Sequence, residues 1–406
     1  MRVSPTTERG KCKNIKWRYG LKMDNKMASK DFKVANLSFL CACFVIMLHV
    51  PRVTEPGLAG VVWWFMHDYI CQCAVPFFFI VSGYFLAGHM TESGWWKREN
   101  IKRIRTLLVP YLIWCVLGFI FIALITLLYN VQKSKPICSN IALFDGQGLR
   151  IFGIDLRFLP VFSILWYVRS LILLSLVSPL LKKYIAMTRI WGLIILMIAR
   201  GCLVPVLLNP IPGFDGIVGE TIRGVMLGIS LRGLLYFSVG IYLRCYPVKR
   251  SIALGVGGLL CGGAIYLARD FAFGGREGFL QLAVPFMLIA MFYFVPSKPL
   301  PDVLLRNSFP VYILHFFACK LPITYIFPTY IGTVWFSVLY SVFSGGGAII
   351  FAELLRKCVP RFHSIAFGGR GRRSIRHENR KDITTRPISS TSTVEAREQG
   401  ETSETE

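Results

Sequence analysis

The sequence predicts an all-α, polytopic integral membrane protein with about ten transmembrane helices. Hydrophobic residues make up 54% of the 406 residues, charged residues make up only 17%, and the mean hydropathy is +0.53. These values are too apolar for a soluble globular protein of this length. Aromatic residues reach 14%, a content that suits packing against lipid and at the membrane interface.

Ten apolar segments are long enough to cross a bilayer. A helix rises about 1.5 Å per residue, so a hydrocarbon core of about 30 Å needs roughly 20 residues. The segments lie near residues 34–51, 68–88, 107–130, 161–181, 189–208, 229–245, 252–270, 278–295, 307–326 and 332–355. The sixth begins near Arg232 and Gly233, and the ninth contains His315, Lys320 and Pro322, so these two are the weakest candidates.

The positive charge lies between these segments and predicts their orientation. The formal net charge is +24, and lysines and arginines gather in alternate loops, for example from Lys97 to Arg105. Such residues accumulate on the cytoplasmic side of a membrane, so the pattern predicts that both termini are cytoplasmic. A basic chain can also bind nucleic acid. Here the cations separate apolar segments instead of forming one stripe, so we expect a lipid bilayer and no nucleic acid as partner.

The same pattern divides the chain into three regions. Residues 1–33 are predicted to be a basic cytoplasmic N-terminal extension, because they contain neither an apolar core nor a signal-peptide cleavage site. Residues 34–361 form the predicted membrane-embedded domain. Residues 362–406 are nearly free of large apolar side chains, so we expect a polar, disordered cytoplasmic tail.

The twelve cysteines do not suggest a metal or redox centre. Most of them lie in or beside apolar segments, where a thiol behaves as a small hydrophobic side chain. The chain contains no CxxC pair, which would be the usual sign of a zinc or thiol redox site. We therefore expect no bound metal ion.

A histidine ends the first apolar segment, "FVIMLHVP", residues 44–51. Pro51 disfavours helical geometry at Val50, so the helix should stop there and leave terminal carbonyl groups near the imidazole of His49. One interpretation is a helix-end histidine at the level of the lipid headgroups. The other is a functional residue, because ionisable groups within membranes are costly.

Two further stretches carry candidate binding residues. In "CAVPFFFIVSGYFLAG", residues 73–88, Pro76 can bend the helix, Gly83 can let another helix approach closely, and Ser82 can contact a ligand. In "GWWKRENIKRIRTLLVPYLIW", residues 94–114, five cations follow two interfacial tryptophans. They can anchor the membrane orientation, or they can bind a polyanion. The polyanion interpretation places Lys102, Arg103 and Arg105 at the start of a helix whose dipole favours anions.

Polar residues also occur within two later segments. Arg169 follows Trp166 by three residues in the fourth segment, and an arginine there should face protein or water instead of lipid. It can pair with a carboxylate or bind the hydroxyls and oxyanions of a substrate. In "NSFPVYILHFFACKLP", Ser308, Tyr312 and His315 are spaced to share one helix face, and an interhelical hydrogen bond would also explain the histidine.

Taken in chain order, these stretches resemble acyltransferase family 3, a class of integral membrane acyltransferases. The resemblance rests on "LSFLCACFVIMLHVP", "VPFFFIVSGYFLA", "KRIRTLLVPYLIW", "LWYVRSLILLSLVSPLL" and "FPVYILHF". Each motif alone is unspecific, but five in the right order, over about Leu37 to His315, are much more specific. The number of about ten spans also agrees with the family.

The resemblance implies transfer of an acyl group, usually acetyl, from acyl-CoA to a hydroxyl of a sugar or cell-envelope glycan in the cytoplasmic (inner) membrane. The family's essential histidine corresponds to His49, and its cytoplasmic R-x-x-R pair corresponds to Lys102 and Arg105. A lysine at the first position keeps the charge but loses the bidentate fork. Many members carry an arginine eleven residues before the histidine, where this chain has Ser38.

The expected mechanism combines these residues. Acyl-CoA docks from the cytoplasm with its phosphates on Lys102, Arg103 and Arg105, while the thioester reaches into the helical bundle. His49 acts as the general base on the acceptor hydroxyl, or carries the acyl group itself. Ser82, Trp166, Arg169, Tyr312 and His315 are the candidate substrate-binding residues. The alternative is a multi-span transporter or exporter of an envelope precursor, which would also need buried polar groups.

Overall fold

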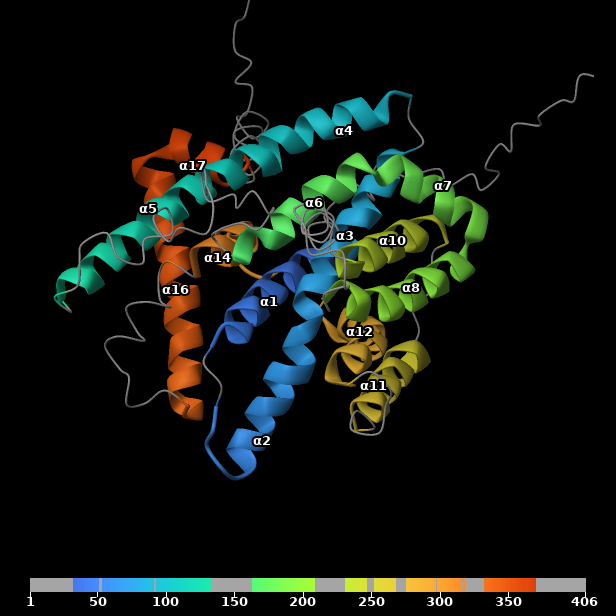
Figure 1. Ribbon diagram of the computed structural model, residues 1–406, viewed down its shortest axis with the longest axis horizontal. Helices are drawn as coiled ribbons and strands as arrows, with labels where there is room; N and C mark the ends of the chain where they lie inside the picture. Colours follow the sequence, from blue (N-terminus) through green and yellow to red (C-terminus); the bar gives the residue numbers. More distant parts are fainter. Residues whose placement is uncertain are drawn as a thin grey trace, which may run out of the picture.

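The computed structural model describes residues 32–50, 53–90, 93–132, 134, 163–208, 231–246, 252–267, 275–296, 298–315, 317 and 332–369. These ranges are largely helical and contain no β-strand (Figure 1), which confirms the predicted all-α class. The helices are α1 (Phe32–Leu48), α2 (Leu58–Phe65), α3 (Ala74–His89), α4 (Trp95–Arg103), α5 (Val109–Gln132), α6 (Trp166–Leu176), α7 (Ser178–Thr188), α8 (Ile190–Leu208), α10 (Leu231–Cys245), α11 (Ile252–Leu267), α12 (Gly275–Phe294), α13 (Asp302–Arg306), α14 (Ser308–His315), α16 (Val334–Cys358) and α17 (Pro360–Ala366).

Three helices in the described ranges are long and apolar enough to cross a membrane. They are the continuous helices Leu58–His89, Trp95–Phe121 and Val334–Cys358. The bent pair α6 and α7 makes a fourth if it counts as one span. Shorter apolar helices include α1 and parts of α8, α10 and α11. The number of about ten spans stays a prediction, and residues 318–326 of the ninth predicted segment lie outside the described residues.

The second predicted segment begins earlier than residue 68, because helix already forms at Leu58. A π-helical turn at Met66–Ile70 and a 3₁₀ turn at Cys71–Cys73 join α2 to α3. Pro76 follows directly, and its ring nitrogen cannot donate to the carbonyl four residues before it. The proline therefore coincides with an irregular turn inside one long helix.

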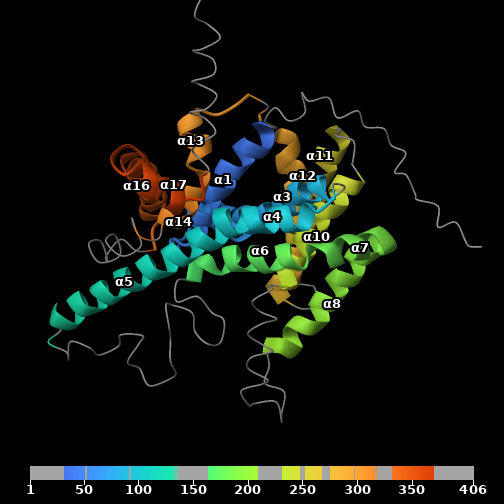
Figure 2. The same cartoon turned by 90° about the horizontal axis from the view of Figure 1, so that it is seen from above.

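The prediction that Lys102, Arg103 and Arg105 lie at the start of a helix is wrong. The helix begins at Trp95, after Gly94 with φ +66°, and continues through a π-helical turn at Ile104–Leu108 into α5. Figure 2 shows α4 and α5 as one continuous rod, with α6 beside it. The free N–H groups and the dipole effect are confined to the first turn of a helix, so they do not act on these three cations.

The fourth predicted segment is not one straight helix, because α6 and α7 meet at a bend of 69° after Leu176. Pro179 lacks an N–H and cannot donate to the carbonyl of Ser175. The Ser178 hydroxyl donates to that carbonyl instead, with an Oγ···O distance of 2.6 Å. The buried backbone acceptor is thus satisfied although the helix is broken.

An ionic cluster joins α13 and α14 to α16. The guanidinium of Arg306 donates two hydrogen bonds of 2.8 Å to the carboxylate of Glu353, and Asn307 Nδ2 donates a third of 2.7 Å. Arg356 also donates to Glu353, at 2.6 Å. A bidentate arginine–carboxylate pair fixes both partners in orientation, so the cluster positions the start of α14.

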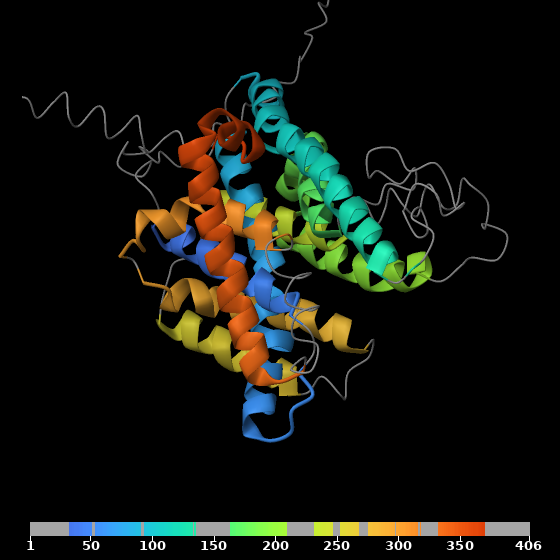
Figure 3. The ribbon, with the colours of Figure 1, turned by 90° about the vertical axis from the view of Figure 1, so that its left-hand side faces the viewer.

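The polar tail was predicted to begin at residue 362, but helix α17 extends to Ala366. Figure 3 shows α17 at one end of α16, beside the rod that α4 and α5 form. Trp114 Nε1 on α5 donates to the carbonyl of Ala366 at 2.8 Å, and Phe367 is buried. The apolar "FHSIAF" stretch explains this packing. Residues 370–406 and 1–31 lie outside the described residues.

Helices α3 and α10 pack with their backbones in contact, as the small residue Gly83 predicts. A Cβ atom on Gly83 would lie 2.1 Å from the carbonyl oxygen of Phe237. A Cβ on Gly240 of α10 would lie 2.0 Å from the carbonyl oxygen of Ile80. Each helix therefore needs glycine where it meets the other.

We predict that Gly83→Val destabilises the fold by about 1–3 kcal/mol, the usual range for overpacking, because the helices must separate. The melting temperature of the purified protein in detergent measures the effect. Gly346→Ala on α16 is the matched control, since no atom lies within 4 Å of its added Cβ. Equal melting temperatures for the two variants would contradict the predicted packing.

Candidate active site

The end of α1 fixes the orientation of the His49 ring. The helix stops at Leu48, and the N–H groups of His49 and Val50 donate three residues back, to Ile46 at 2.9 Å and Met47 at 3.2 Å. The backbone N–H of His49 therefore bonds Ile46 and not Val45. The carbonyl of Val45 contacts the His49 ring instead, with a distance of 2.8 Å to Nδ1.

This contact determines where the ring can accept a proton. A carbonyl oxygen only accepts hydrogen bonds, so Nδ1 must carry the hydrogen. In a neutral imidazole the other nitrogen then has the free lone pair. The geometry therefore makes Nε2 of His49 the basic atom, on a ring that is half-buried.

A second imidazole lies against His49. His315 on α14 is fully buried, and the centroids of the two rings are 5.0 Å apart with their planes at 58°. Nδ1 of His315 contacts the carbonyl of Tyr312 at 2.8 Å, so the same argument leaves Nε2 as its basic atom. The fold thus brings together α1 and α14, which lie far apart in the sequence.

The predicted face of α14 is held by hydrogen bonds and ring contacts. Ser308 and Tyr312 both donate to backbone carbonyls, of Leu305 at 3.0 Å and of Ile164. The Tyr312 ring packs edge-on against Tyr167, with centroids 5.7 Å apart. These contacts assign Ser308 and Tyr312 a structural role in the described ranges, and their contact with a substrate stays a prediction.

Two other predicted residues differ in their surroundings. Trp166 packs on Phe79 of α3, with ring centroids 6.2 Å apart. Ser82 is half-buried on α3 and has no hydrogen-bond partner among the residues that the structure describes. Ser82 is therefore available for a ligand, but no observed contact assigns it one.

Arg169 is a half-buried cation without a carboxylate partner in the described part of the chain. Its Nε and Nη1 atoms are buried and have no hydrogen-bond acceptor there. Tyr111 and Cys115 of α5 are its electrostatic neighbours. Of the two predicted roles, pairing with a carboxylate finds no support, and binding of a hydroxyl or oxyanion stays a prediction.

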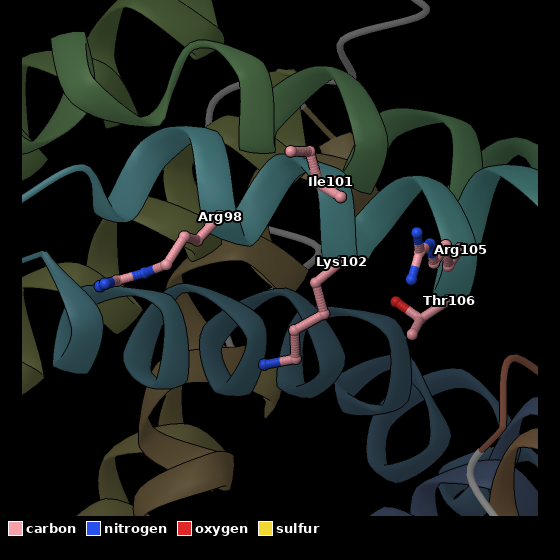
Figure 4. Close-up of a pocket in the computed structure, with 5 residues that line it drawn as sticks. All are labelled: Arg98, Ile101, Lys102, Arg105 and Thr106. Carbon is pink, nitrogen blue, oxygen red and sulfur yellow. The ribbon is translucent and has the colours of Figure 1, made fainter.

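A basic groove lies along α4 and the π-helical turn that follows. Arg98, Ile101, Lys102, Arg105 and Thr106 line a volume of about 340 Å³. Figure 4 shows these side chains in order along the helix, with Arg98 at one end and Arg105 and Thr106 at the other. The three cations are spaced four and three residues apart, so they share one helix face.

The groove contains two of the three predicted cations, Lys102 and Arg105, and the binding of acyl-CoA by the three stays a prediction. Arg103 does not line it, because Arg103 Nη1 donates to Ser175 Oγ of α6 at 2.9 Å on another side of the helix. Arg98 does line it and was not predicted, although its spacing from Lys102 and Arg105 could have identified it. Lys102 also pairs with Glu99, with an N···O distance of 3.3 Å.

The turn after α17 packs against the backbone of Thr106, one of the residues that line the groove. Gly368 has φ +67°, and a Cβ there would lie 2.4 Å from the carbonyl oxygen of Thr106. Only glycine therefore fits against the backbone of a groove residue.

Within the described ranges, no group of three or more histidine, cysteine or acidic residues is arranged to hold a metal ion.

Comparison with known proteins agrees with the resemblance found in the motifs. The model of acyltransferase family 3, described as an acyltransferase domain, matches residues 36–353. This range runs from α1 to α16 and contains both imidazoles, the groove cations and Arg169. No curated protein and no solved structure matches the chain. Because the family model covers most of the sequence, the chain belongs to acyltransferase family 3.

Proposed function

We propose that the protein is a membrane O-acyltransferase that moves an acyl group, acetyl in the simplest case, from acyl-CoA to a hydroxyl of a sugar or cell-envelope glycan. Family membership supports acyl transfer. The observation that carries the proposal is the fixed His49 ring, whose Nε2 is the basic atom. The acyl-CoA donor and the glycan acceptor are inferences from the groove and from the family.

The groove suits the phosphate end of the donor. Three cations on one helix face can neutralise several phosphate charges, and hydrogen bonds between charged groups are the strong ones. Arg98 and Arg105 offer planar forks to phosphate oxygens, while Lys102 acts as a point charge. The same helix continues as α5 past Tyr111 and Cys115 to the neighbourhood of Arg169. A donor bound in the groove can therefore extend along this helix into the bundle.

The chemical step needs one base and no metal ion. Nε2 of His49 takes the proton of the acceptor hydroxyl while its oxygen attacks the thioester carbonyl carbon. The tetrahedral intermediate collapses, the carbon–sulfur bond breaks, and the proton on His49 passes to the leaving thiolate. The products are the ester and the CoA thiol. In the covalent variant, Nε2 attacks the thioester carbonyl carbon and CoA leaves as the thiolate. The acceptor hydroxyl then attacks the acyl-imidazole, the carbon–nitrogen bond breaks, and the hydroxyl proton passes to the thiolate.

Arg169 is the candidate for stabilising the oxyanion. The arginine that many family members carry before the histidine is Ser38 here, and its hydroxyl donates to the Val34 carbonyl at 2.7 Å. Because a serine is uncharged, Ser38 cannot supply the positive charge of that arginine. A guanidinium whose Nε and Nη1 are buried without a partner can donate to the oxygen on which negative charge develops.

We predict that His49→Ala lowers acyl transfer by at least 10²-fold, because general base catalysis contributes about that factor or more. Membranes containing the variant are assayed with labelled acetyl-CoA and envelope glycan, and the protein is quantified by immunoblot. His89→Ala, at an exposed histidine of α3, serves as control and should retain activity. Normal transfer by His49→Ala would refute the assigned role.

We predict that the double substitution Lys102→Ala and Arg105→Ala raises KM for acyl-CoA by about 10- to 100-fold, with a smaller effect on kcat. A buried hydrogen bond to a charged group contributes about 1.5–3 kcal/mol, but charge pairs at exposed positions such as Lys102 and Arg105 contribute only about 1 kcal/mol each. The two together thus give about 2 kcal/mol, and 1.4 kcal/mol corresponds to a factor of ten. Lys97→Ala, on the same helix but outside the groove, is the matched control. An unchanged KM would show that the donor binds elsewhere.

We predict that Arg169→Gln lowers kcat by about 10²-fold, the usual cost of losing one oxyanion donor, while KM for acyl-CoA changes little. Arg169→Lys keeps the charge but loses the planar fork, so its kcat should lie between those of wild type and Arg169→Gln. Steady-state kinetics in detergent measure both constants. A rise in KM with normal kcat would instead assign Arg169 to ground-state binding.

A further inference from the structure

We propose that Thr106 is a further binding residue of the groove, whose hydroxyl donates a hydrogen bond to the phosphate that Arg105 binds. The ligand class is a phosphate ester, and in the proposed function it is the phosphate end of acyl-CoA. The inference rests on that function, because the function places acyl-CoA in the groove. It adds an uncharged hydrogen-bond donor to the cations that line the groove.

The first argument is the position of Thr106. It lines the groove together with Arg105, and Figure 4 shows both side chains at the same end of it. Thr106 is half-buried, so part of it is open to a ligand in the groove. Where proteins bind phosphate groups, the oxygens accept from threonine hydroxyls as well as from arginine and lysine. A phosphate held by Arg105 can therefore also meet the Thr106 hydroxyl.

The second argument is that the hydroxyl is not used by the protein. A threonine or serine within a helix commonly donates to the carbonyl four residues before it. Ser38 and Thr188 do so here, each with an Oγ···O distance of 2.7 Å. The Thr106 hydroxyl has no hydrogen bond to any residue that the structure describes. It is therefore available to a ligand.

The third argument is the turn in which Thr106 lies. Residues Ile104–Leu108 form a π-helical turn, and the N–H that follows it donates to the carbonyl five residues before, that of Ile104. Such a turn contains more residues than an α-helical turn, so consecutive side chains are separated by a smaller rotation. This favours Arg105 and Thr106 facing the same groove. Single π turns within α-helices are frequent at functional sites.

The alternative role of Thr106 is packing against the turn after α17. That contact uses its backbone, because a Cβ on Gly368 would lie 2.4 Å from the Thr106 carbonyl oxygen and 3.0 Å from its Cα. Every residue type supplies these two atoms. The side chain can therefore be tested separately: valine keeps its branched shape without the hydroxyl, and serine keeps the hydroxyl without the methyl group.

The test compares Thr106→Val with Thr106→Ser as purified full-length proteins in detergent, and calorimetry measures the Kd for CoA. We expect Thr106→Val to raise the Kd by about 3- to 10-fold, because one hydrogen bond to the phosphate is lost. Thr106→Ser should bind like wild type. Thr106→Ala also lacks the hydroxyl and should bind like Thr106→Val, which covers a valine variant that does not fold.

The matched control is Thr188→Val on α7, whose hydroxyl bonds a backbone carbonyl outside the groove. It should leave the Kd for CoA unchanged. If the shape of the Thr106 side chain matters instead, Thr106→Ser is the weaker binder and Thr106→Val binds like wild type. That result, or equal Kd values for all variants, overturns the proposal.

A double-mutant cycle tests whether Thr106 and Arg105 bind the same phosphate. In an Arg105→Ala background, Thr106→Val should raise the Kd for CoA by a smaller factor than in wild type, because residues that share a partner are not additive. In a Lys97→Ala background, outside the groove, the full factor should remain. Equal factors in both backgrounds overturn the proposal.

Failure of the proposed function is distinguishable from failure of this inference. If wild type transfers acetyl from acetyl-CoA while Thr106→Val binds CoA like wild type, this inference alone is refuted. If wild type transfers no acyl group from acetyl-CoA, the proposed function is refuted and this inference with it. Detergent without anionic lipid leaves CoA as the source of phosphate, so a change in Kd does not come from a lipid headgroup.

Discussion

The structure of the site depends on where the hydrogen-bond ladder of α1 ends. Pro51 disfavours helical geometry at Val50, and the last N–H groups donate three residues back instead of four. One more regular turn would have used the Val45 carbonyl for the backbone N–H of His49. Because that carbonyl accepts from the ring instead, a local backbone rule determines which nitrogen of His49 is basic.

One helix connects the two halves of the proposed site. From Lys102 to Cys115 the rod formed by α4, the π-helical turn and α5 rises about 20 Å at 1.5 Å per residue. It presents the basic groove at one end and the neighbours of Arg169 further along. A π turn adds a residue to the helix and rotates the side chains that follow. The cations and the apolar positions of α5 can therefore face different surroundings on one rigid element.

Several features were predictable because they follow from residues close in sequence. Pro51 predicted the end of α1, and Gly83 predicted a close helix contact. The helix start at Trp95 was also predictable from the local sequence, since no glycine or proline lies between Gly94 and Pro110. The cluster of cations suggested instead that a helix begins near Lys102. The 69° bend after Leu176 depends on packing in addition to Pro179. The contact of His49 with His315 joins residues too far apart for any spacing rule to predict.

In the proposed reaction, the distribution of charge would let acyl transfer from CoA take place inside an apolar bundle. The phosphates of a CoA donor carry most of its charge, and the groove that suits them lies on exposed cations. Only the uncharged thioester then has to enter the interior. There the charge that appears is transient, and His49 and Arg169 are the residues that we propose to meet it. Ser38 is uncharged and its hydroxyl donates to the Val34 carbonyl, so we propose Arg169 as the residue that meets the oxyanion.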